Sequence, residues 1–387
     1  MKSTYLLLTM SAAILAATGS YAQQPPSYAI VQLGTLGGNT GAANAVNNAG
    51  WVMGAGFLPG NTTEHATVWL GSQTVDLGTL GGPNSSIAWT AVKNNHGLVA
   101  GVSDTSIIQP MGEIWSCAAA FFPSVSGHTC QGFRWKDHIM AALPTLGGSN
   151  GVAAGVNNLD QIAGWAETSN PDATCIPPQV LQFEAVVYGP APEQIQELPP
   201  LSGDLDGAAT AINDNGQVVG ISGTCGTAVG GSTAAHAVLW ENGVPANIGN
   251  LGGVAWNTPT SINNEGVIVG FSDLPGDSAS NPNYHAFLWT AGAGIQDLGT
   301  LPGDSFSIAW GINIQGQVVG QSINASGASR AFIWQNGVMT DMNTLIAPGS
   351  VSLVYANDIN DSGEIVGGAY NSTTGDYPAF RAVPLRK

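Results

Sequence analysis

The chain has 387 residues, of which 44% are hydrophobic and 9% are charged, and it contains 53 glycines and 11 tryptophans. The apolar content argues against a disordered chain and indicates packed strands joined by many turns. The formal net charge of −17 argues against a surface for nucleic acid or anionic membranes, because such surfaces need clustered Lys and Arg. The acidity is typical of an extracellular protein kept in solution by its charge, and it would also suit cationic ligands.

Residues 1–22 have the pattern of a secretory signal peptide. Lys2 supplies the positive charge, the apolar run 5–17 is too short to span a bilayer, and small residues precede a cleavage site after Ala22. An uncleaved anchor is the alternative, whereas a lipid anchor is not expected, because no Cys lies near this site. We expect the mature chain, residues 23–387, to be secreted to the periplasm or the cell exterior without a further membrane span.

The mature chain contains seven copies of one unit, spaced by about fifty residues. The most constant part is an Asn-x-x-Gly turn followed by a Val-rich run, as in 46–54 and 212–220. Asn is expected to close its own turn through its side chain, and Gly to supply a positive φ. The turn is clearest at Asn47, Asn213, Asn263, Asn313 and Asn360. It is degenerate at Asn94 and Asn157, where Asp160 replaces the first Gly.

Each unit is predicted to contain four strands, which we name A to D. Strand A ends at the Asn, and strand B is the Val-rich run. Strand C ends in an aromatic residue that we expect to lie in the core between neighbouring units, most clearly Trp69, Trp240, Trp289 and Trp334. Strand D is predicted in the Leu-Gly-Thr-Leu-Gly-Gly element at 33–38 and 77–82, with altered copies further along the chain.

Three of these elements in fixed order resemble the HAF-repeat family of probable extracellular repeat proteins. They are Leu-Gly-Thr-Leu-Gly-Gly at 33–38, Ile-Asn-Asp-Asn-Gly-Gln-Val-Val-Gly at 212–220 and His-Ala-Phe-Leu-Trp at 285–289. The resemblance covers residues 28–387 and is weakest in the third repeat, which has Asp160 for Gly and Tyr188 for Trp. It implies secretion and repetition, and it implies no activity for any residue.

The order of the strands predicts a closed ring. The mature chain enters in a strand D, at 28–36, and finishes just after a strand C, near 379–383. The first strand can therefore complete the last unit and leave no free edge. We predict an all-β, seven-bladed β-propeller of four-stranded antiparallel blades, closed by the N-terminal strand, as a single domain over 23–387. An open β-solenoid is the alternative, although neither end offers a capping segment.

The histidines give no sign of a catalytic or metal site. His65, His236 and His285 occupy one repeat position at the start of strand C, which indicates a structural role. The other three are scattered without metal-ligand spacing, and His128 is notable only because it lies in the longest loop. No Gly-x-Ser-x-Gly turn with a plausible His partner is present, so a serine hydrolase is not expected.

The carboxylates offer two weak signals for calcium. Asp204 and Asp206 stand in an Asp-x-Asp-Gly sequence like the start of a calcium loop, but no Glu follows at the required distance. Asp273 and Asp277 flank a Pro-Gly turn, which is first of all a turn-forming sequence. No pair of facing carboxylates can be assigned for a glycosidase. We therefore expect neither a catalytic residue nor a cofactor, with calcium as an open alternative.

The chain contains four cysteines, Cys117, Cys130, Cys175 and Cys225. A secreted chain permits disulfides, and four cysteines allow three pairings. All four fall in or beside predicted B–C loops, so we favour Cys117–Cys130 within one loop and Cys175–Cys225 between neighbouring blades. Free thiols are the alternative.

The loops favour binding over catalysis. The A–B turns are short and constant, whereas the B–C loops vary greatly in length, and the longest lies between Gly101 and Gln131. A constant scaffold with one variable end is typical of displayed binding loops, although drift in surface loops gives the same pattern. We predict a monomer that binds an extracellular glycan or protein on its B–C loops. A polysaccharide-acting enzyme with carboxylates near the ring axis and a structural cell-surface protein are the alternatives.

Overall fold

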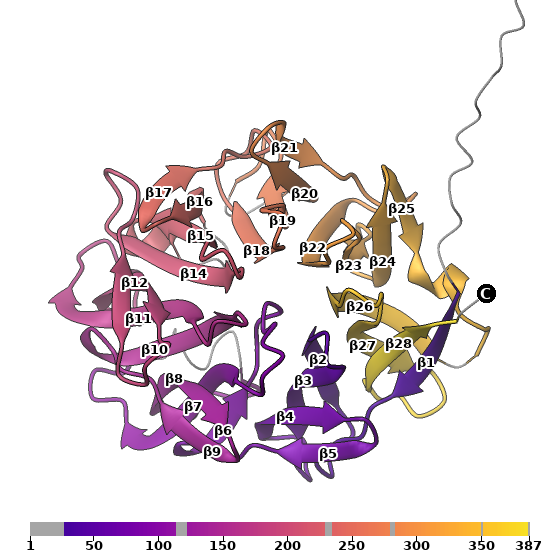
Figure 1. Cartoon of the computed structure of the whole chain (residues 1–387), viewed down its shortest axis with the longest axis horizontal. Coiled ribbons are helices and arrows are strands. Elements are labelled where there is room, and N and C mark those ends of the chain that lie inside the picture. Colours follow the sequence, from indigo (N-terminus) through magenta and orange to yellow (C-terminus); the bar gives the residue numbers. More distant parts are fainter. Residues whose placement is uncertain (1–26, 114–121, 229–233, 279–282, 350, 386–387) are drawn as a thin grey trace, which may run out of the picture.

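The computed structural model describes residues 27–113, 122–228, 234–278, 283–349 and 351–385, so the predicted signal peptide lies outside it. Within these residues, seven four-stranded antiparallel sheets form a ring around a central axis (Figure 1). The predicted seven-bladed β-propeller is therefore confirmed. No described helix is long and apolar enough to cross a membrane.

The strands of each blade run from the axis outward in the order A to D. Strands A are β2 (Gly41–Val46), β6 (Gly81–Ser86), β10 (Gly147–Val156), β14 (Asp206–Ile212), β18 (Thr258–Ile262), β22 (Phe306–Ile312) and β26 (Val351–Ile359). Strands B are β3 (Trp51–Phe57), β7 (Val99–Ile108), β11 (Ile162–Pro171), β15 (Val218–Gly223), β19 (Ile268–Asp273), β23 (Val318–Ile323) and β27 (Ile365–Asn371).

The two outer strands complete each blade. Strands C are β4 (Glu64–Leu70), β8 (His128–Lys136), β12 (Leu181–Tyr188), β16 (His236–Glu241), β20 (Tyr284–Thr290), β24 (Ser329–Gln335) and β28 (Ala379–Pro384). Strands D are β5 (Gln73–Asp76), β9 (Ile139–Ala142), β13 (Ile195–Leu198), β17 (Val244–Asn247), β21 (Gly294–Asp297), β25 (Val338–Asp341) and β1 (Tyr28–Gln32). Two short 3-10 turns, η1 (Cys225–Thr227) and η2 (Met342–Leu345), lie in connections.

The N-terminal strand closes the ring. β1 pairs antiparallel with β28, so that Tyr28 lies opposite Pro384 and Gln32 opposite Phe380. Blade 7 is thus built from both ends of the described chain, and β1 lies beside the C-terminal end in Figure 1. This is the closure that the strand order predicted.

A glycine in strand B is required by close contact with strand A. In every blade except blade 2, the inner strand carries a β-bulge opposite this glycine, as between Ala43 and Ala45 in blade 1. A Cβ at Gly54 would lie 1.9 Å from the carbonyl oxygen of Ala42, a distance that no side chain tolerates. The two glycines of the repeated Asn-turn motif therefore have different roles. The first Gly turns the chain, and the last Gly lets strands A and B approach each other.

The prediction for strand D was wrong in its position. The outer strands end before the Leu-Gly-Thr-Leu-Gly-Gly element, which forms the connection to the next blade. Its first Leu is buried, as at Leu33 and Leu77, and its Thr hydroxyl bonds within the connection, as from Thr79 Oγ1 to the Gly82 carbonyl at 2.8 Å. Glycines at φ near +105°, such as Gly37, turn the chain there, which a continuous strand does not permit.

The ring axis is occupied by a segment of blade 2. Residues 87–93 leave β6 and reach the centre of the ring (Figure 1). Main-chain hydrogen bonds join Lys93 and Ala91 to Val156 of blade 3, and Thr90 Oγ1 donates to the Trp310 carbonyl of blade 6 at 2.9 Å. Lys93 Nζ forms an ion pair with the buried Asp358 of blade 7. This axial segment, residues 87–93, therefore contacts blades on several sides of the ring.

Candidate functional site

At the A–B end of the ring, where strands A and B are joined, a closed cycle of amides links all seven blades. Each repeat Asn donates its Nδ2–H to the main-chain carbonyl of the repeat Asn in the next blade, over distances between 2.8 and 3.2 Å. The cycle runs through Asn47, Asn94, Asn157, Asn213, Asn263, Asn313, Asn360 and back to Asn47. All seven side chains are buried.

The same side chains also form the turns that the sequence predicted. Asn263 Oδ1, for example, accepts the N–H groups of Glu265 and Val267, both at 3.0 Å. In the degenerate copy, Asp160 adopts φ of +58° and so keeps the backbone conformation of the Gly it replaces. The sequence analysis assigned the turn to this Asn and missed its bond to the next blade, because only the ring brings the two together.

The recess at the A–B end is small. It is lined by these asparagines, by apolar residues of strands A and by Lys93, and its volume is about 70 Å³. Such a space holds a few water molecules, whereas pockets for small organic ligands measure roughly 300 Å³ or more. The chemistry of this end is therefore that of a structural network.

The B–C end, where strands B and C are joined, carries a cluster of aromatic side chains over blades 5 and 6. Tyr284 stacks on Trp256 with ring centroids 4.9 Å apart and lies 5.2 Å from Phe306. Phe271 packs edge-on against these rings and against Trp310, which reaches the axial segment. Phe271 is buried, whereas the other four are half-buried and so retain exposed ring surface.

Trp256 is the least ordinary member of this aromatic cluster. Its backbone has φ of +39°, a conformation that bulky side chains rarely adopt. Within the described residues, its buried indole N–H has no hydrogen-bond acceptor. Backbone strain and unpaired polar groups concentrate at ligand sites. The sequence held a signal for the cluster, since its five residues stand outside the repeated aromatic position at the end of strand C.

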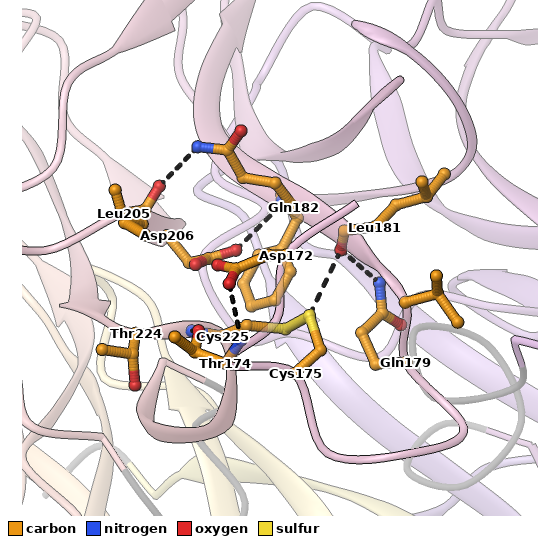
Figure 2. Close-up of a disulfide and its surroundings, with 12 residues drawn as sticks. Asp172, Thr174, Cys175, Gln179, Leu181, Gln182, Leu205, Asp206, Thr224 and Cys225 are labelled. Atoms are coloured by element: carbon orange, nitrogen blue, oxygen red, sulfur yellow. Dashed lines mark hydrogen bonds between the residues drawn. A yellow bond between two sulfur atoms is a disulfide. The ribbon is translucent and has the colours of Figure 1, made fainter. Parts of the chain in front are cut away.

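A pair of carboxyl groups joins blades 3 and 4 at the same end (Figure 2). Asp206 is buried at the start of β14, and its Oδ1 accepts the Phe183 N–H at 3.0 Å. Asp172, in the loop after β11, faces it and accepts the Thr174 N–H at 2.7 Å. Apart from the facing carboxyl group, the second oxygen of each group has no hydrogen-bond donor among the described residues.

These two groups share one proton. Burial, with a contribution from the neighbouring Asp172, raises the pKa of Asp206 to about 8. Although burial opposes it, hydrogen bonds from Thr174 and Asp206 lower the pKa of Asp172. Two carboxylates in contact cannot both ionise at low cost, so Asp206 keeps the proton at neutral pH.

A disulfide lies directly beside this carboxyl pair. Cys175, in the B–C loop of blade 3, is bonded to Cys225, in η1 of blade 4 (Figure 2). This is the inter-blade pair that the sequence analysis favoured. Cys130 lies in β8 and is also disulfide-bonded. Its predicted partner, Cys117, lies outside the described residues.

The other carboxylates considered from the sequence do not converge on one site. Asp204 accepts hydrogen bonds from Ser222 and His236, whereas Asp206 faces Asp172. Asp273 and Asp277 lie side by side, and burial together with this neighbour raises the pKa of Asp273 to about 7. Among the described residues, no group of three or more His, Cys, Asp or Glu side chains is arranged to hold a metal ion.

One further carboxyl group has the properties of an acid. Glu64, at the start of β4, is buried, and burial raises its pKa to about 8, although a hydrogen bond with Ser86 acts in the opposite direction. Its charge also raises the pKa of Tyr355 in β26, so the two side chains lie within electrostatic reach. The sequence analysis missed Glu64 because nothing in its local sequence indicates burial.

The repeated histidines and tryptophans lie within the scaffold. His65 and His285 pair with Asp76 and Asp297 of strands D, at 2.9 and 3.0 Å. Among the aromatic residues at the end of strand C, Trp69 and Trp240 are buried, whereas Trp289 and Trp334 are half-buried. The indole N–H of Trp69 donates to the Gly34 carbonyl, and that of Trp240 to the Pro199 carbonyl, both at 2.7 Å. Each bond joins strand C to the connection from the preceding blade.

Comparison with known proteins assigns the chain to no family. No protein-family model matches the chain, and no curated protein matches it. Among solved structures, TolB from Acinetobacter baumannii aligns with 76% of the chain at 11% identity and a TM-score of 0.42. Trypanosoma rangeli sialidase aligns with 92% at 9% identity and a TM-score of 0.43. The chain spans 66% of the TolB chain and 59% of the sialidase chain. Membership of the HAF-repeat family stays a prediction.

Proposed function

We propose that this protein is a secreted HAF-repeat propeller that binds an extracellular glycan at its B–C end. The observation that carries the proposal is Trp256, half-buried and stacked on Tyr284, with a positive φ and an unpaired indole N–H. A flat aromatic face that keeps exposed ring surface binds the C–H face of a sugar ring.

The surroundings of Trp256 support this assignment. Phe306 and Trp310 of the neighbouring blade 6 belong to the same cluster and are half-buried, so they offer further aromatic surface for a ligand. The Cys175–Cys225 disulfide fixes the loops of blades 3 and 4 at the same end, and disulfides are typical of oxidising compartments outside the cytosol. The recess described above at the A–B end is, in contrast, too small for a sugar ring.

A glycan array with the mature protein, followed by titration of every hit, tests the proposal. Substituting Trp256→Ala or Tyr284→Ala should weaken binding by about 2 kcal/mol or more, since buried aromatic contacts dominate such interfaces. Trp51→Ala is the matched control, because this half-buried Trp lies beside the turn at the opposite end. Equal loss of binding in Trp51→Ala and Trp256→Ala, with both variants folded, would contradict the proposed location.

An enzyme acting on polysaccharide is the second candidate, and Glu64 is the observation that favours it. A carboxyl group with a pKa near 8 is protonated at neutral pH and can serve as a general acid. Each glycan hit should therefore also be assayed for hydrolysis with the wild type and with Glu64→Gln. Turnover that is lost in Glu64→Gln would establish the enzyme, and binding without turnover would leave the binding proposal in place.

A further inference from the structure

We propose that Asp273 and Asp277 form a binding site for one divalent cation, of the calcium type, in the B–C loop of blade 5. Asp273 is the last residue of β19 and is fully buried. Neither of its carboxylate oxygens has a hydrogen-bond donor among the described residues. The group nearest to it is a second carboxylate, that of Asp277, four residues along the loop.

Two other blades show what this position normally requires. Asp104 in β7 and Glu167 in β11 stand three residues after the close-contact Gly of strand B, as Asp273 does. Asn84 donates both its main-chain and its side-chain N–H to Asp104, at 3.2 and 3.0 Å. Asn150 does the same for Glu167, at 2.8 and 2.9 Å. Hydrogen bonds from amides of the same blade therefore stabilise these two buried carboxylates.

Blade 5 lacks these donors. In the strand A–B register, the position that Asn84 and Asn150 hold is occupied in blade 5 by Trp256, two residues before the Thr258 carbonyl that contacts the strand B Gly. The next residue, Asn257, donates to the Ala235 carbonyl at 3.2 Å and accepts the Ser272 hydroxyl at 2.7 Å. The group that faces Asp273 is the Asp277 carboxylate, so blade 5 has a second negative charge where blades 2 and 3 have hydrogen-bond donors. A buried carboxylate that faces only another carboxylate is costly unless a positive charge lies between them.

The geometry suits a divalent cation better than a side chain. Asp273 offers two free oxygens from the interior, and the half-exposed Asp277 offers oxygens from the solvent side and leaves a path for entry. The Val254 and Ala255 N–H groups hold Asp277 in place at 3.2 to 3.3 Å. Two carboxylates balance a charge of two, and calcium accepts irregular oxygen ligation completed by water.

The cation would also affect the aromatic surface. Asp273 lies opposite Tyr284 in the ladder between β19 and β20, and Tyr284 stacks on Trp256. A bound ion at this point would fix the start of strand C and with it the stacked rings. The proposal does not depend on glycan binding, since cation binding can be measured alone.

Titration of the chelator-treated mature protein with calcium, by calorimetry and by competition against terbium luminescence, tests the site. We expect one site with a dissociation constant of about 10⁻⁴ to 10⁻³ M, as in other extracellular modules. Tyr284 and Trp256 should sensitise the terbium emission. Asp277→Asn should weaken binding by about tenfold or more, and because Asp277 is half-exposed this variant should fold.

Asp297→Asn is the control in the same blade, because its carboxylate is already paired with His285. Calcium binding in this variant should equal that of the wild type. Absence of calcium and terbium binding to the wild type up to about 10 mM would overturn the proposal and leave a shared proton between the two groups. Unchanged affinity in Asp277→Asn, or an equal loss in Asp297→Asn, would overturn it as well.

Discussion

At the scale of single residues, the repeat Asn has two separable roles. Its oxygen closes the local turn, and its N–H binds the next blade. Asn324 provides an internal comparison, because it forms the same turn with Ser326 and Ala328 in the B–C loop of blade 6, where its recorded side-chain contacts stay within the loop. The two roles can therefore be measured apart.

We expect Asn263→Ala to lower the free energy of unfolding by about 1–3 kcal/mol, because it removes the bond to the Asn313 carbonyl and leaves the N–H groups of Glu265 and Val267 without their acceptor. Asn263→Asp keeps the acceptor for the turn but cannot donate to the Asn313 carbonyl, so it should remain clearly destabilising. Asn324→Ala is the control and should cost less than either variant in urea unfolding. A cost of Asn324→Ala equal to that of Asn263→Ala would show that the turn alone accounts for the effect.

The carboxyl pair of Asp206 and Asp172 predicts a pH effect on stability. The pKa of Asp206 is raised from its ordinary value of 3.8 to about 8 in the folded state. Between these two pH values, the folded chain keeps a proton on Asp206 that the unfolded chain has already released. The stability that this group contributes is present at low pH and is lost as the pH rises through 8. Glu184 faces the same group and adds negative charge.

Asp206→Asn should remove this dependence, because an amide can donate to Asp172 at any pH and still accept from Phe183. We expect the variant to have a melting temperature above that of the wild type at pH 9, with a smaller difference at pH 5. Melting curves of both proteins over this range give the answer. Parallel curves for wild type and variant would exclude a shared proton at this position.

At the scale of elements, the axial segment connects distant blades through one buried ion pair. Burial raises the pKa of Asp358 to about 6 even though Lys93 acts in the opposite direction, so the aspartate depends on its partner. Asp358 also accepts the Val46 N–H at 2.8 Å. Removing Lys93 would leave a buried carboxylate with main-chain hydrogen bonds but no positive charge to balance it.

Lys93→Met should therefore cost about 3–5 kcal/mol in urea unfolding, the range for breaking one side of a buried ion pair. The double variant Lys93→Met, Asp358→Asn should recover part of this loss, because no charge is then left unpaired. Additive effects of the two single substitutions would mean that the pair does not act as a unit in the folded ring.

The elements also show how far the sequence could predict the structure. The seven units, their strands A to C and the ring closure follow from repetition, because every copy supports the same assignment. The axial segment is not repeated. Its only trace is the distance of 17 positions from Leu77 to Asn94, against 14 from Leu33 to Asn47. Strand D was misplaced because the repeated Leu and Thr look like a strand, although the glycines around them bend the chain.

The candidate sites were also harder to predict, because their residues are not part of the repeat. Asp172 and Asp206 belong to different blades, and so do Tyr284 and Phe306, so no local pattern joins them. The loss of the donor to Asp273 also becomes visible only when blades 2, 3 and 5 are compared in one register. The function that we propose for the B–C end thus rests on departures from the repeat, whereas the sequence made the repeat itself most evident.

At the scale of the whole molecule, β1 is a separable part of the ring. Deleting residues 28–37 should leave the outer edge of β28 unpaired and lower the melting temperature sharply. The same segment can be attached after Pro384 through a two-residue Asn-Gly turn, like that at Asn242 and Gly243. This variant should regain the melting temperature of the wild type, because Tyr28 lies opposite Pro384 and the segment can again pair with β28. A deletion variant that melts like the wild type would contradict closure by this strand.

The same pairing of β1 with β28 determines how the chain can fold. Hairpins within blades 1 to 6 form from neighbouring segments, whereas blade 7 needs two strands from opposite ends of the described chain. Contacts of such long range form slowly, so the last blade should be completed after the others. Until then β28 presents an open edge that the β1 of a second copy can fill. At high concentration during refolding, this protein should therefore form strand-exchanged oligomers, and dilution should favour the closed ring.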